Sequence, residues 1–307
     1  MLRAILLWLA RNEWLRDRVP QLAFVRRAVR RFMPGEDVGS ALRAADDLGP
    51  RGIGAVLTNL GENVTAASEA DSVRDHYLEV LRLIEARGLA AEISVKLTQL
   101  GVDVDPNGVD ESMGVLVSRA TAANGRVVWI DMEGSAYTER TVATYERLRA
   151  SHGSVGLCLQ AYLRRTADDV RRLLPLEPAI RLVKGAYAEP TEIAYRGDEV
   201  EAEFLRLATI LLDARTERGV IRLVLGTHST RLIEAVAAHA ASRGLPRSSF
   251  EVHMLYGVRV DEQLRLAREG YLVRTLISYG TAWYPWYMRR LAERPANLLF
   301  ALRQLGP

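Results

Sequence analysis

The chain has 307 residues, of which 49% are hydrophobic and 26% charged, an ordinary globular composition long enough for one large barrel or two medium domains. Its single cysteine, Cys158, excludes an intrachain disulfide framework and a cysteine-based metal site, so we expect a buried, inert thiol. A net charge of +3 without a long basic stripe argues against a nucleic-acid-binding protein.

Residues 1–50 are predicted to form an N-terminal helical extension to one domain at 51–307. Residues 1–11 are apolar like the start of a signal peptide, but charges follow at 11–17 and no small-residue cleavage site is present, which favours an amphipathic helix. The arginines within 26–31 fit a solvated helix face or a weak contact with anionic lipid. No stretch approaches the length of a membrane span, so we expect a cytoplasmic protein, with a peripheral contact at the inner face of the membrane as an option.

Eight short apolar runs recur after residue 50 and are typical of parallel strands that are buried on both faces. They are Gly54–Leu60, Glu92–Leu97, Val127–Met132, Val155–Gln160, Ile180–Val183, Arg222–Gly226, Phe250–Leu255 and Tyr271–Ile277.

Helix-like stretches separate these runs, among them Asp71–Arg87, Val200–Arg218 and Arg231–Arg243, each followed by a glycine that favours a helix end. Eight strands alternating with helices predict a (β/α)₈ barrel. A doubly wound open sheet is the alternative, but it normally carries a glycine-rich phosphate loop after the first strand. Residues 60–63 do not form such a loop.

Polar residues lie near or just after the C-terminal ends of the predicted strands, where a barrel of this kind has its active site. They are Glu62, Lys96, Asp131, Gln160, Arg181, Lys184, Thr227, His228 and His253. Each could be a structural ion pair or a helix cap by itself, but their joint placement on one rim indicates a site. No His, Cys and Asp cluster has metal-ligand spacing, so no metal is predicted.

Arg289 and Arg290 stand side by side after the aromatic run 283–287. Two guanidinium groups beside aromatic rings suit a small carboxylate next to a flat apolar surface, although the local sequence alone favours the basic face of a terminal helix. With Lys96, Arg181 and Lys184 they would make a cationic mouth for a carboxylate substrate or a phosphate-bearing cofactor.

Several of these motifs resemble the proline dehydrogenase family, in particular its short, single-function bacterial members. The resemblance covers about residues 35 to 307 and is carried by 94–98, 131–133, 159–162, 181–187, 227–228 and 287–293. It implies a distorted (β/α)₈ barrel whose last helix lies over the barrel mouth, with non-covalent FAD at the strand C-termini. It also implies oxidation of L-proline to 1-pyrroline-5-carboxylate by hydride transfer from C5 to flavin N5, with electrons passing to a membrane quinone.

The resemblance also implies roles for individual residues. Lys96, Arg289 and Arg290 would bind the substrate carboxylate, Asp131 and Arg181 would be the catalytic pair, and Glu62 would pair with the first terminal arginine in the empty site. The FAD would be held by Met132, Gln160, Arg181, Lys184, Gly185, Ala186, Thr227 and His228.

The chain departs from the family in the substrate pocket. Leu276 and Trp286 stand where tyrosines are common, and His253 stands where a glutamine is usual. Leu276 and Trp286 are therefore expected to shape a pocket for proline or a substituted proline such as 4-hydroxyproline. Two further readings remain open: a barrel lyase that uses Lys96 or Lys184 as a Schiff-base amine, and a non-catalytic membrane- or nucleic-acid-associated module on the same scaffold.

Overall fold

The computed structural model describes residues 12, 14, 18, 19, 25, 29–123, 125–218 and 221–293, without the side chains of 216–218 and 289–293. Much of the predicted N-terminal extension before residue 29 lies outside these residues, including Arg26 and Arg27. The division of the chain at residue 50 therefore stays a prediction. Within the described part, no helix is both long and apolar enough to span a membrane.

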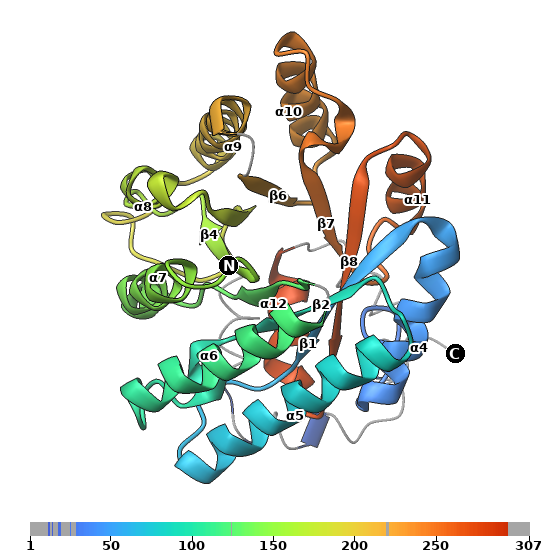
Figure 1. The fold of residues 1–307 in the computed structure, drawn as a ribbon, viewed down its shortest axis with the longest axis vertical. Helices are drawn as coiled ribbons and strands as arrows, with labels where there is room; N and C mark the ends of the chain where they lie inside the picture. Colours follow the sequence, from blue (N-terminus) through green and yellow to red (C-terminus); the bar gives the residue numbers. More distant parts are fainter. Residues whose placement is uncertain are drawn as a thin grey trace.

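Eight parallel strands form a closed barrel in which each strand pairs with its neighbours in sequence order and the first pairs with the last (Figure 1). They are β1 (Ile53–Asn59), β2 (Ala91–Val95), β3 (Val128–Ile130), β4 (Val155–Gln160), β5 (Ala179–Val183), β6 (Arg222–Gly226), β7 (Glu251–Leu255) and β8 (Leu272–Tyr279). All eight predicted strands are present, and the (β/α)₈ fold is confirmed.

The helices surround this barrel (Figure 1). They are α4 (Val38–Leu48), α5 (Ala67–Ala86), α6 (Pro106–Ala122), α7 (Ser135–Arg149), α8 (Thr166–Leu173), α9 (Asp198–Arg218), α10 (Thr230–Ser242), α11 (Val260–Arg268) and α12 (Trp283–Glu293). Short 3₁₀ turns are η2 (Gly49–Arg51), η3 (Leu97–Leu100), η4 (Leu174–Leu176) and η5 (Arg247–Ser249). The three helices predicted above correspond to α5, α9 and α10.

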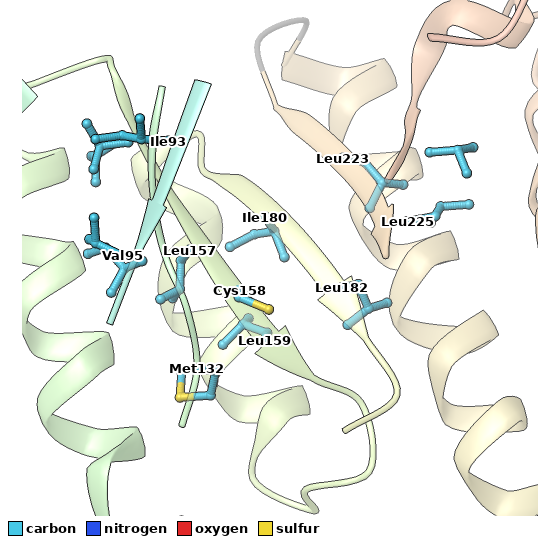
Figure 2. Close-up of a cluster of buried hydrophobic side chains, with 14 of the residues drawn as sticks. Ile93, Val95, Met132, Leu157, Cys158, Leu159, Ile180, Leu182, Leu223 and Leu225 are labelled. Atoms are coloured by element: carbon cyan, nitrogen blue, oxygen red, sulfur yellow. The ribbon is translucent and has the colours of Figure 1, made fainter. Parts of the chain in front are cut away.

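The main core lies between the outer faces of the strands and the helices. Alternate residues of neighbouring strands contribute to it, because successive side chains of a strand point to opposite faces. Figure 2 shows such pairs on β2, β4, β5 and β6, for example Ile93 with Val95 and Leu223 with Leu225. These four side chains are buried within one continuous cluster. The intervening residues of each strand face the barrel interior, where several of them are polar or charged.

The interior of the barrel at the N-terminal ends of the strands contains a network of four charged residues. Arg222 Nη1 lies 2.8 Å from Glu92 Oε1, and its Nε lies 2.5 Å from Glu251 Oε1. Arg274 Nε lies 3.2 Å from Glu251 Oε2, and its Nη2 lies 3.7 Å from Glu92 Oε1. The two arginines and two glutamates balance in charge, as buried ionic groups require.

Trp129 of β3 fills the barrel above this network. Its Nε1 donates a 2.7 Å hydrogen bond to Glu92, and its ring packs in a small apolar cluster that Leu276 joins. The guanidinium groups of Arg222 and Arg181 lie 5.2 and 5.1 Å from the ring centroid, within cation–π range. Gly156 opposite must lack a side chain, because a Cβ there would come within 2.5 Å of the Trp129 ring.

Helix α12 lies over the mouth of the barrel instead of beside it, as predicted. In Figure 1 it projects onto the middle of the ring of strands. Its aromatic residues pack with Leu60, which follows β1, and with Phe32 and Met33 of the segment before α4. Trp283 Nε1 also donates a 2.9 Å hydrogen bond to Glu36. The aromatic run before the arginine pair therefore anchors this helix to the barrel rim.

Candidate active site

A cavity of about 520 Å³ opens at the C-terminal ends of the strands, below α12. Its volume lies within the range of small-molecule and cofactor sites. Every predicted site residue whose side chain the structure describes lines this cavity. They are Glu62, Lys96, Asp131, Met132, Gln160, Arg181, Lys184, Gly185, Ala186, Thr227, His228, Leu276 and Trp286.

Asp131 and Arg181 form an ion pair in the wall of this cavity, directly after β3 and within β5. Ser94 of β2 joins them: its Oγ donates to Asp131 Oδ1 at 2.9 Å and accepts from Arg181 Nη2 at 2.7 Å. Burial alone would lower the pKa of Arg181, but the Asp131 carboxylate beside it raises that pKa above the ordinary value. The guanidinium is therefore a fixed, oriented positive charge.

Lys96 and Glu62 face each other across the mouth, with Nζ and Oε1 4.0 Å apart. Lys96 follows β2 and is largely buried, whereas Glu62 lies three residues beyond the end of β1 and is more exposed. The nearby Glu133 accepts hydrogen bonds from the backbone and hydroxyl of Thr98, and burial raises its pKa. Residues 96–98 are thus held in place by a carboxylate that follows the next strand.

Lys184 follows β5 and is paired with Glu201 of α9. Glu201 in turn contacts Arg231 of α10, whose side chain is 76% exposed. One carboxylate therefore bridges a cavity lysine to a surface arginine on the next helix. This contact could not be predicted from the sequence, because Glu201 lies within an amphipathic helix and resembles a solvent-exposed charge.

Gly185 has a backbone conformation, φ +119°, that side chains rarely adopt. A Cβ at this position would lie 2.3 Å from the ring of Tyr162. Nearby, Gln160 at the end of β4 donates through Nε2 to the carbonyl of Met132 at 3.3 Å. Backbone and side chains from β3 to β5 thus form one continuous wall of the cavity.

Thr227 and His228 follow β6 and are held by backbone contacts. Thr227 Oγ1 accepts a 3.2 Å hydrogen bond from the Ser229 amide, and His228 Nε2 accepts one of 3.0 Å from the Leu255 amide. Because Nε2 is the acceptor, the neutral His228 ring carries its hydrogen on Nδ1. The loop after β6 is therefore fixed against the end of β7.

Leu276 of β8 and Trp286 of α12 line the cavity from different elements. Leu276 packs against the interior cluster around Trp129 and is only partly buried. Arg289 and Arg290 lie within α12, but their side chains fall outside the described part, so their expected contacts with substrate or with Glu62 stay predictions. Trp286 lies on the same helix and lines the cavity, so α12 borders the cavity.

Several cavity residues had no assigned role in the sequence prediction: Thr58, Cys158, His253, Leu255 and Ser278. Burial raises the pKa of the Cys158 thiol, which agrees with the inert thiol expected above. Thr58 of β1 and Ser278 of β8 are paired in register, and both line the cavity. Strand alternation could have revealed them, because Ser278 lies two residues after Leu276.

Comparison with known proteins is informative once this geometry is described. The profile of the family described as proline dehydrogenase matches residues 41–303. The chain is 33% identical over 306 residues to proline dehydrogenase 1 of Bacillus subtilis (strain 168), covering 99% of this chain and 98% of that one. It is 34% identical over 280 residues to proline dehydrogenase of Deinococcus radiodurans, covering 89% and 88% of the two chains.

Solved structures are similar in fold. Proline utilization A from Bdellovibrio bacteriovorus, inactivated by N-propargylglycine, superposes with a TM-score of 0.81 at 22% identity. The match covers 88% of this chain and 33% of that one. Proline utilization A from Corynebacterium freiburgense gives a TM-score of 0.73 at 21% identity, over 95% of this chain and 34% of that one. Both chains are about three times longer than the part they share with this barrel.

Proposed function

The chain belongs to the proline dehydrogenase family of oxidoreductases, and we propose that it uses FAD to oxidise L-proline to 1-pyrroline-5-carboxylate. We further propose that the electrons pass to a membrane quinone. The observation that carries the proposal is the cavity at the strand C-termini, where the ion pair of Asp131 and Arg181 faces the same space as Lys96 and Lys184.

The cavity wall fits a polar, ring-shaped cofactor. Buried side-chain atoms without a hydrogen-bond partner among the described residues gather there: Thr58 Oγ1, Gln160 Oε1, Arg181 Nη1, His253 Nδ1 and Ser278 Oγ. Buried polar groups normally have partners, and leaving one unpaired costs about 1–3 kcal/mol. A ligand with several donors and acceptors would satisfy this set.

When bound, FAD supplies an acceptor for the hydride that leaves C5 of proline. Met132, Gln160, Arg181, Lys184, Gly185, Ala186, Thr227 and His228 would hold it. Arg181 and Lys184 place positive charge in the cavity wall, which favours the negative charge that an electron-accepting ring gains. Because Arg181 is already oriented by Asp131 and Ser94, this charge requires no rearrangement during the reaction.

Lys96, Arg289 and Arg290 would bind the substrate carboxylate. Lys96 is largely buried at the mouth and has Glu62 as its counter-charge in the described structure. A carboxylate substrate would offer a second anionic partner at this position, and such fixation of the reacting carbon is worth several kcal/mol in general. Asp131 acts on the reaction through Arg181, whose guanidinium it orients.

A substituted proline such as 4-hydroxyproline is the second candidate substrate. Leu276 of β8 lines the cavity with a short apolar side chain. Thr58 of β1 and Ser278 of β8 are paired in register two residues further along and line the same cavity. A hydroxyl on the substrate ring would find polar partners there. The Schiff-base alternative is disfavoured by the family match, which is to oxidoreductases and not to a lyase.

The cofactor proposal is tested by the purified protein itself. We expect one FAD per chain, bound without a covalent link, so that acid precipitation releases the yellow flavin into the supernatant. Quantifying flavin in supernatant and pellet checks this expectation. Protein that purifies without flavin and takes up none when FAD is added would contradict this expectation. Flavin that stays with the pellet would contradict it as well.

A further inference from the structure

His253 is a cavity residue that contacts both the Trp129 ring and the carboxylate of Glu251. It lies on β7, and its side chain is 3% exposed. Its ring packs edge-on against Trp129, with ring centroids 5.7 Å apart, and it lines the cavity together with Arg181 and Asp131. His253 therefore lies between the charge network in the lower barrel and the open cavity above it.

One ring nitrogen of His253 is held by that network. Nε2 lies 3.4 Å from Glu251 Oε2, and the same carboxylate accepts hydrogen bonds from Arg222 and Arg274. Burial alone would raise the pKa of Glu251, but hydrogen bonds from His253 and Arg222 lower it well below the ordinary value. The carboxylate thus has no hydrogen to give, and Nε2 must be the donor in this contact.

The other ring nitrogen is left as an acceptor. Burial lowers the pKa of His253 to about 4, so the ring is neutral at physiological pH and Nδ1 carries a lone pair. This atom is buried and has no hydrogen-bond partner among the described residues. His253 lines the cavity, whereas Glu251 does not.

On the neighbouring strand, Gly226 of β6 is paired in register with His253 and also lines the cavity. The side chains of Val183 and Arg181 fill the space where a side chain at Gly226 would begin, and both residues line the same cavity. On the other side, Leu255 follows two residues later on β7 and offers an apolar surface. A buried acceptor without a partner among the described residues, on a side chain that lines the cavity and is held by Glu251, is a feature of a binding residue.

We propose that His253 recognises the molecule bound in the cavity, with Nδ1 accepting a hydrogen bond from an N–H or O–H group of that molecule while Glu251 holds Nε2. The inference rests on the proposed function, because it requires a ligand at this place. Two bound species carry such donors. The flavin has a ring imide N–H and hydroxyl groups on its ribityl chain, and proline has its amine.

The test compares His253→Asn with His253→Leu. Both substitutions remove the contact with Glu251, and the two side chains have nearly the same size and branching. They differ in that the asparagine amide places a polar atom near the position of Nδ1, whereas leucine does not. Any effect that comes from packing or from losing Glu251 is therefore common to both variants, and thermal unfolding of the flavin-free proteins checks that both fold.

Two ligands are titrated into wild type and both variants. FAD affinity is measured on flavin-free protein by quenching of flavin fluorescence, and proline affinity by the concentration that half-saturates anaerobic flavin reduction. We expect His253→Leu to bind one of the two ligands roughly three- to tenfold more weakly than His253→Asn, the effect of one hydrogen bond. A difference in FAD affinity identifies the flavin as donor, and a difference confined to proline identifies the substrate.

Equal affinities of the two variants for both ligands overturn the role of His253. If His253→Leu does not fold, His253→Met takes its place as the variant without a polar atom. Wild-type protein that binds no FAD overturns the proposed function together with this inference. Wild type that binds FAD and is reduced by proline, with variants that do not differ, overturns the role of His253 alone.

Discussion

The two ends of the barrel interior differ in whether their buried polar groups have hydrogen-bond partners. At the N-terminal ends of the strands, Arg222, Arg274, Glu92 and Glu251 bond to one another in a charge-balanced network. At the C-terminal ends, Arg181 Nη1 and Gln160 Oε1 are buried without partners among the described residues. The charged groups at the lower end pair with one another, whereas the upper end contains buried groups that the proposed ligand would pair.

This difference divides stability from function along the barrel axis. A satisfied buried network specifies and rigidifies the interior, whereas unpaired buried groups cost free energy that binding of a ligand recovers. Trp129 connects the two ends, since its ring lies between the guanidinium groups of Arg222 and Arg181. Substitutions below Trp129 are therefore expected to affect unfolding, and substitutions above it to affect binding and rate.

The largest effect is expected in the lower network. Arg222→Met leaves Glu92 and Glu251 with one fewer cationic partner, and breaking a buried ion pair from one side costs about 3–5 kcal/mol. Denaturant unfolding should show a loss of this size, with near-normal substrate affinity in the folded fraction. Arg171→Met is the control, because Arg171 forms an exposed pair within α8 worth about 1 kcal/mol or less. Equal losses of unfolding free energy in Arg222→Met and Arg171→Met would refute the assignment of stability to the lower network.

The next effect concerns the arginine pair of α12. Arg289→Met or Arg290→Met should weaken substrate binding by about 2–5 kcal/mol, a factor of roughly 30 or more, with FAD retained. Substrate titration of the flavin-loaded protein measures this change, and Arg268→Met on the exposed face of α11 serves as a matched control. A variant that lost flavin but kept its substrate affinity would place the pair at a different site.

The cations of the cavity wall are expected to act on the chemical step. Lys184→Ala and Arg181→Ala should slow flavin reduction by about a hundredfold at saturating proline, the usual effect of removing one charge-stabilising group. Rapid mixing under anaerobic conditions measures the rate. Arg231→Ala is the control, since Arg231 contacts the same Glu201 but does not line the cavity. Normal reduction with only a raised half-saturating concentration would argue against this role.

The smallest effect is expected at Leu276. Leu276→Tyr would fill space in the cavity and narrow the substrate range toward proline, by about 1–3 kcal/mol relative to 4-hydroxyproline. The ratio of kcat/KM for the two substrates, in wild type and variant, checks this expectation. A wild type that already excludes 4-hydroxyproline, with a ratio that Leu276→Tyr leaves unchanged, would show that Leu276 does not set the preference.

Much of the fold and the composition of the cavity could be predicted, because both depend on local patterns. Apolar runs separated by helix signals predicted the eight strands, and the residues that follow parallel strands must meet at one rim. The limits of β3 were drawn too wide, because Val127 and Met132 are buried and apolar like a strand but lie outside its paired residues. Burial alone does not mark where pairing ends.

The contacts between side chains distant in sequence could not be predicted. Arg222 and Glu92 lie 130 residues apart and meet because both face the barrel interior. The role of Glu201 beside Lys184 and the tautomer of His253 likewise depend on which side chains the closed sheet brings together. Strand alternation indicates which residues face inward, but barrel closure decides their partners.

We propose that the cavity holds a flavin that proline reduces. The most direct measurement is the visible absorbance of the purified, FAD-loaded protein when L-proline is added without oxygen. Loss of the oxidised flavin bands, saturating with proline and returning when a quinone is added, is the predicted result. A flavin spectrum that proline and 4-hydroxyproline leave unchanged would contradict the claim.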